Sequence, residues 1–128
     1  MSYTLTWKNL NTLNQLKKVI SGSQMKPVLL FKHRSSSTKS NQVKQLLENE
    51  WTIPPNQLDC YLVDVMENKS IASKVSDFAG VSNVFPQVLL FADEVAMYDE
   101  SHEMINVKKI KIALKIVNRT FRWMETRV

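Results

Sequence analysis

The sequence predicts an α/β fold in which a mixed β-sheet carries helices on both faces. The first observation is the order of the elements, βαβαβαββα, which follows from apolar residues that switch between strand-like and helix-like spacing. The second is that the inner strand segments are nearly continuous apolar runs, as in strands covered on both faces. With 128 residues, 44% of them hydrophobic, the chain is long enough for one domain of this kind, residues 1–128.

The amino-terminal part predicts two strand and helix pairs. Residues 4–7 alternate polar and apolar side chains and predict a short strand, and a helix follows that ends at Ser21-Gly22-Ser23. Pro27 precedes a second, apolar strand over residues 28–32. The next helix begins near Thr38, and we expect three of its apolar residues to share one buried face: Val43, Leu46 and Leu47.

The middle of the chain predicts a third pair. Residues 58–65 form an apolar strand, and Asn68 is expected to cap a helix over residues 69–78 that Gly80 ends. Its expected inward residues are Ile71, Val75 and Phe78.

A hairpin and a long helix complete the fold. Residues 87–91 and 95–98 predict two antiparallel strands joined by a tight turn, and Asn106 is expected to cap the last helix. The buried stripe of that helix is Val107, Ile110, Leu114 and Val117. We expect a core over residues 4–117 and a basic, aromatic extension over residues 118–128 that contains Phe121, Trp123 and Met124 among Arg119, Arg122 and Arg127. This order of elements is that of the thioredoxin fold.

Composition excludes several classes of function. Cys60 is the only cysteine, so an intramolecular disulfide, a two-cysteine redox motif and a cysteine zinc site are all excluded, and we expect no metal. No apolar run approaches the length of a membrane span, and residues 1–10 lack the apolar block of a signal peptide, which favours a cytoplasmic protein. The net charge of +5 allows weak attraction to anions, but we do not expect nucleic acid as a partner.

The strand-to-helix corner over residues 32–40 carries a run of hydroxyl side chains: Ser35, Ser36, Ser37 and Thr38. The backbone N–H groups at a helix start favour an anion, and Lys32, Arg34 and Lys39 would add positive charge there. Ser37 is interpreted as the helix cap rather than as a nucleophile activated by His33, because a serine hydrolase also needs an oriented base and an oxyanion hole.

Four segments together resemble the YtxJ family: Val28-Leu29-Leu30-Phe31-Lys32-His33, Tyr61-Leu62-Val63-Asp64-Val65 with Asn68, Pro86-Gln87-Val88-Leu89-Leu90, and Tyr98-Asp99-Glu100-Ser101-His102. The resemblance covers about residues 5–114. Members are small bacterial proteins of thioredoxin fold, described as monothiol bacilliredoxins or general stress proteins of the bacillithiol system. It implies a cysteine at this corner, usually followed by proline, that attacks mixed disulfides between bacillithiol and protein thiols.

In this chain the matching positions hold Ser37 and Thr38. A thiol at a helix start supplies thiolate near neutral pH, whereas a serine hydroxyl has no comparable anionic form and cannot enter a disulfide. Either the serine arose by natural divergence or it was introduced in place of a cysteine by engineering. The further departure at Arg34 favours natural divergence.

The resemblance also implies the remaining site residues. Pro86 matches the thioredoxin-fold proline whose preceding peptide bond is cis, Phe85 would then place its ring beside Ser37, and His102 resembles a family feature. The partner implied is a protein or a low-molecular-weight thiol, bacillithiol by resemblance, bound between Ser37 and Pro86, with no other cofactor.

Three hypotheses for function follow. The first is a binding or regulatory module that lacks the nucleophilic thiol. The second is a monothiol bacilliredoxin-type thiol-disulfide oxidoreductase, in which Ser37 replaces a cysteine or Cys60 does the chemistry, although a mid-strand thiol is usually inert. The third is an interaction protein that uses its basic carboxy-terminal helix, against the simpler interpretation that those arginines extend over an apolar stripe.

Overall fold

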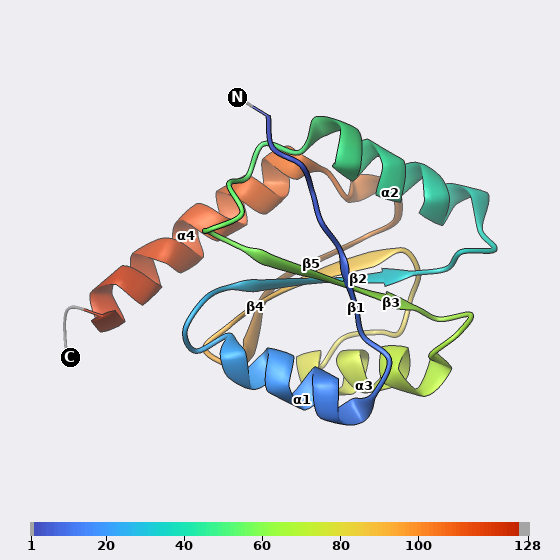
Figure 1. The fold of residues 1–128 in the computed structure, drawn as a ribbon, viewed down its shortest axis with the longest axis horizontal. Helices are drawn as coiled ribbons and strands as arrows, with labels where there is room; N and C mark the ends of the chain where they lie inside the picture. Colours follow the sequence, from blue (N-terminus) through green and yellow to red (C-terminus); the bar gives the residue numbers. More distant parts are fainter. Residues whose placement is uncertain (1, 126–128) are drawn as a thin grey trace.

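The computed structural model describes residues 2–125 and the side chains of residues 2–120. Figure 1 shows a central sheet between two layers of helices. The elements in chain order are β1 (Lys8–Asn9), α1 (Leu13–Gly22), β2 (Val28–His33), α2 (Thr38–Glu50), β3 (Asp59–Asp64), α3 (Lys69–Ala79), β4 (Gln87–Ala92), β5 (Val95–Ser101), the 3-10 helix η1 (His102–Met104) and α4 (Val107–Glu125).

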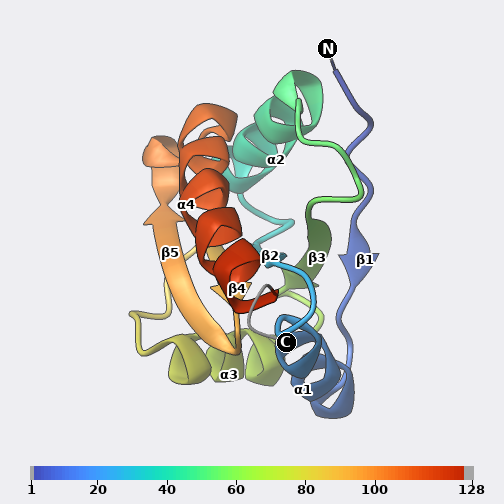
Figure 2. The same ribbon diagram turned by 90° about the vertical axis from the view of Figure 1, so that its left-hand side faces the viewer.

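The sheet is mixed, as the sequence predicts. Its strand order is β1-β3-β2-β4-β5. The strands β1 and β2 each run parallel to β3, whereas β4 runs antiparallel to both β2 and β5. Helices α1 and α3 cover one face and α2 and α4 cover the other (Figure 2).

Two hydrophobic clusters fill the space between the sheet and each helical layer. Along β2, Val28 and Leu30 join the cluster under α1 and α3, whereas Leu29 and Phe31 join the cluster under α2 and α4. The same alternation sends the next two side chains, Lys32 and His33, to opposite faces of the sheet. All six residues of β2 are buried.

The first strand lies later in the chain than predicted. Its ladder with β3 joins Lys8 to Tyr61 and Asn9 to Leu62, so the strand expected over residues 4–7 is wrong. Trp7 nevertheless packs against the core, and its Nε1–H donates to Glu48 Oε2 at 2.7 Å. Alternating polar and apolar residues therefore indicate that one side of the segment packs against the core. A segment can pack in this way without pairing as a strand.

Three side chains depart from their predicted roles. Leu46 and Phe78 are 42% and 48% exposed, because Val43 and Leu47 in α2 and the buried residues of α3 already fill the space against the sheet. The side chain of Asn68 does not cap α3 and instead donates from its amide to Asn11 Oδ1 at 3.1 Å.

Two other predicted helix boundaries are confirmed. Gly80 ends α3 with a φ of +70°, a conformation that glycine adopts without steric cost. Asn106 caps α4, since its Oδ1 accepts from the backbone N–H of Lys109 at 2.9 Å. The stripe predicted for α4 is buried throughout, whereas the side chains from Phe121 to Arg127 lie outside those the structure describes.

The turn between β4 and β5 is held by a buried serine at the end of α1. Asp93 and Glu94 have φ values of 51° and 66°, which non-glycine residues rarely adopt. The Ser23 carbonyl accepts from Asp93 N–H at 2.8 Å, and Ser23 Oγ accepts from Glu94 N–H at 2.8 Å. Ser23 is fully buried, so these contacts link α1 to the hairpin in place of water.

We predict that Ser23→Ala lowers the free energy of unfolding by about 1–3 kcal/mol, because Glu94 N–H loses its buried acceptor. Ser21→Ala, at an exposed position of the same helix, is the matched control and should change it by less than about 0.5 kcal/mol. Urea denaturation measures both. Equal losses in the two variants would contradict the role given to Ser23.

Candidate functional site

The corner after β2 is built around Ser37. Ser37 has extended backbone dihedrals, and its Oγ accepts from the backbone N–H of Ser40 at 3.2 Å. Its own N–H donates to the Arg34 carbonyl at 2.9 Å. Ser37 is therefore the N-cap of α2, and the interpretation of its hydroxyl as a cap is confirmed.

His33 contacts the first turn of α2 through Ser40. Its ring is buried, and Nδ1 lies 2.6 Å from Ser40 Oγ, which also accepts from Arg34 N–H at 3.0 Å. Burial lowers the pKa of His33, which favours the neutral imidazole. Among the described residues His33 contacts Ser40 rather than the Ser37 hydroxyl, so it holds the start of α2 and is not placed as a base for Ser37.

Lys32 lies on the other face of the sheet, and its predicted role in attracting an anion to the corner is wrong. Its side chain is fully buried. The ammonium donates to Ser76 Oγ, to Asn83 Oδ1 at 2.6 Å and to Gln87 Oε1 at 2.9 Å. Burial lowers its pKa to about 8. Lys32 therefore attaches the segment before β4 to the central strand.

The side chain of Phe85 contacts Lys32 and is not placed beside Ser37. The ammonium of Lys32 lies 4.8 Å from the centre of the Phe85 ring, and the ring packs against the cluster under α1 and α3. The hypothesis that this ring lies beside Ser37 is therefore replaced by one in which it covers the buried ammonium.

Asp64 is a corner residue that the sequence reasoning missed. It ends β3 opposite His33, and its Oδ1 accepts from Ser35 N–H at 3.2 Å and from Met66 N–H at 3.0 Å. Burial raises the pKa of Asp64, but these hydrogen bonds and the nearby His33 outweigh it and hold the pKa below its ordinary value. Its place at the end of a strand parallel to β2 was the available signal.

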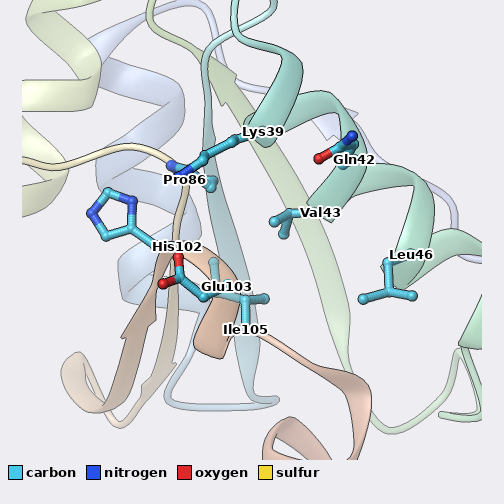
Figure 3. A pocket seen from close by; sticks show the side chains of 8 residues that line it. All are labelled: Lys39, Gln42, Val43, Leu46, Pro86, His102, Glu103 and Ile105. Atoms are coloured by element: carbon cyan, nitrogen blue, oxygen red, sulfur yellow. The ribbon is translucent and has the colours of Figure 1, made fainter.

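A groove of about 370 Å³ opens beside the corner, between α2, Pro86 and η1 (Figure 3). Its apolar wall contains Val43, Leu46, Pro86 and Ile105, and its polar rim contains Lys39, Gln42, His102 and Glu103. We call it the Pro86 groove.

The Phe85-Pro86 peptide bond is cis, as predicted, and the Pro86 carbonyl accepts from His102 N–H at 2.9 Å. The structure thus brings Pro86 and His102 together in this groove. Ser35 and Ser36 are exposed on the loop beside it, and Thr38 is exposed at the start of α2. Leu46 and Ile105 were missed as site residues, because Leu46 was expected on the buried face of α2 and no local pattern places Ile105 beside Pro86.

The thiol of Cys60 is buried and protonated at neutral pH, so it is unreactive in the folded protein. It is 5% exposed, in the cluster under α2 and α4. Burial, with a further contribution from Asp59, raises its pKa to about 12, so the thiolate is scarce at neutral pH. Within residues 2–125, we find neither a group of side chains that could hold a metal ion nor a helix long and apolar enough to cross a membrane.

Comparison with known proteins assigns the family. The model of the monothiol bacilliredoxin BrxC matches residues 8–110. The chain belongs to the monothiol bacilliredoxin family. No curated protein matches the sequence. As a bacilliredoxin with Cys60 as its only cysteine, the chain is consistent with a substituted active-site position.

Solved structures show the same fold. Thioredoxin from Trypanosoma brucei brucei superposes with a TM-score of 0.70 at 11% identity, over 89% of this chain and 92% of that one. Thioredoxin from Malassezia sympodialis (Mala s 13) gives 0.68 at 18% identity, over 88% and 90%. The predicted thioredoxin fold is therefore confirmed for this bacilliredoxin.

We predict that Lys32 makes the stability of this bacilliredoxin depend on pH in alkali. Between pH 8 and its ordinary pKa of 10.5, Lys32 is deprotonated when folded and protonated when unfolded, so the unfolded state binds more protons and stability rises with pH. Urea denaturation at several pH values gives the difference in the free energy of unfolding between the wild type and Lys32→Met. Cys60 and Tyr98 also titrate in alkali, but they are present in both proteins, so their contributions cancel. A difference that stays constant across this range would contradict the lowered pKa.

Proposed function

We propose that this bacilliredoxin has lost thiol exchange and acts as a binding or regulatory module of the bacillithiol redox and stress system. The observation that carries the proposal is Ser37. By the family resemblance it occupies the position of the reactive cysteine, and its hydroxyl caps α2 through the N–H of Ser40. A cap at this place keeps the corner folded and offers no sulfur to a mixed disulfide.

The Pro86 groove supports the binding part of the proposal. It adjoins the corner, and its apolar wall with a polar rim suits a short peptide segment. The partner class is a protein segment, or a protein or small molecule modified with bacillithiol, held between Ser37 and Pro86. We place this function in the cytoplasm, where a chain with a single unpaired thiol is ordinary.

The alternative is a thiol-disulfide oxidoreductase, and family membership favours it. In the chain as it stands such chemistry would need Cys60. That thiol is buried in β3 and has a raised pKa, so the strand would have to open before a disulfide could be attacked.

Thiol titration of the folded protein, followed by incubation with a protein that carries a bacillithiol mixed disulfide, tests the loss of chemistry. We predict that Cys60 reacts with a thiol reagent only after denaturation and that the wild type releases no bacillithiol. Ser37→Cys, run in parallel, should take up bacillithiol, because the helix start lowers the pKa of a thiol there. Release of bacillithiol by the wild type would overturn the proposal.

The binding part has its own test. The probe is an extended peptide with bacillithiol on one cysteine, titrated calorimetrically into the wild type. We predict that Leu46→Asp weakens binding by about tenfold, since it places a charge in the apolar wall. Phe78→Asp on α3, an apolar residue of similar exposure outside the Pro86 groove, is the matched control and should leave the affinity unchanged. Equal effects of the two changes, or no binding by the wild type, would exclude this groove.

A further inference from the structure

Exposed aliphatic side chains gather along α4 and the edge strand β5. Met97 is 48% exposed, Ile112 53% and Ile116 58%. Among the described strands β5 pairs with β4 alone, so no described strand pairs with its other edge. A contiguous exposed apolar patch beside an open strand edge is typical of an interaction surface.

Figure 2 shows α4 running beside β5, and the patch lies over these two elements. A cavity of about 250 Å³ lies between the two elements, and we call it the α4–β5 groove. Its lining consists of Met97, Tyr98, Lys109, Ile112, Ala113, Ile116 and Val117. It shares no lining residue with the Pro86 groove.

Positive charge flanks the α4–β5 groove on the side away from β5. Lys108, Lys111 and Lys115 follow one another at helical spacing and, with Ile112, line an adjacent hollow whose only acidic residue is Glu50. Of the α4 lysines within residues 2–120, Lys109 alone pairs with a carboxylate, Glu100 at 3.5 Å. Three lysines beside one glutamate leave an excess of positive charge along the apolar groove.

The wall of the groove also holds a donor without an acceptor. The hydroxyl of Tyr98 is buried, and it has no hydrogen-bond partner among the described residues. An unsatisfied buried hydroxyl costs about 1–3 kcal/mol, so this wall is locally destabilised, although the enclosed oxygen is not itself a contact for a ligand.

We propose that the α4–β5 groove binds an acidic amphipathic segment of another protein. The apolar side chains of the segment would lie against Ile112, Ile116 and Met97, and its carboxylates would meet the row of lysines. Charge complementarity favours this partner over a second copy of the chain related by two-fold symmetry, since such a copy would bring two lysine rows together.

Two other anionic partners fit the groove less well. Its exposed residues are Met97, Ile112 and Ile116, and the ring of Tyr98 packs against the core cluster under α2 and α4, so it does not stand free for a nucleic acid base to stack on. A membrane surface needs an apolar face that projects into the lipid, whereas this one is concave.

The test uses the full chain and a fluorescein-labelled peptide of leucine and glutamate at helical spacing, followed by fluorescence anisotropy. We expect binding that weakens as salt rises, because exposed charges are screened. Ile116→Ser and the pair Lys111→Glu with Lys115→Glu should each weaken it by about tenfold. The matched controls are Phe78→Ser for the apolar change and Lys17→Glu with Lys18→Glu on α1 for the charge change.

Several outcomes would overturn the proposal. These are no binding of the peptide, equal binding of a peptide with lysine in place of glutamate, or equal losses in the variants and their controls. Sedimentation that shows a dimer dissolved by Ile116→Ser would assign the groove to a second copy. Binding of single-stranded DNA or of anionic lipid vesicles, lost in the same variants while the peptide fails to bind, would assign it to those partners.

Discussion

The structure depends on the hydrogen bonds made by the two polar side chains at the buried end of β2. This strand lies between β3 and β4 with all six residues buried, and its last two side chains, Lys32 and His33, are polar. A polar group inside a protein costs several kcal/mol unless it is hydrogen-bonded, so each must find partners on its own face of the sheet. Lys32 finds the oxygens of Ser76, Asn83 and Gln87, and His33 finds Ser40.

These two sets of contacts position both halves of the candidate site. The contacts of Lys32 fix the segment that leads through Pro86 into β4, and the contact of His33 fixes the first turn of α2 below Ser37. One alternating strand end therefore aligns two segments that are distant in sequence. The Ser37 hydroxyl caps the same turn of α2 through the N–H of Ser40, so hydrogen bonds hold the corner and no cysteine takes part in them.

The sequence predicted the fold because apolar spacing is set by which side of an element is covered. The prediction failed at residues 4–7, where one side of the segment packs against the core although the segment does not pair as a strand. It also failed at Leu46 and Phe78, because each of their helices has more apolar residues than its buried face accommodates. For the site, local chemistry was enough to identify Ser37 as a cap. The face to which Lys32 turns and the contact of Asp64 with Ser35 depend on strand register, which no local pattern carries.

Because Cys60 is buried, the sulfur atoms that an oxidant can reach in the folded chain are those of exposed methionines. While the protein is folded, an oxidant meets the exposed sulfurs of Met25, Met66, Met97 and Met104 before it meets the cysteine. Met66 contacts the Ser36 hydroxyl at the corner through its sulfur, and Met97 lines the α4–β5 groove. Conversion of Met97 to its sulfoxide would place a polar, chiral group on an apolar wall, so oxidation would change the surface of this bacilliredoxin before it reached the thiol.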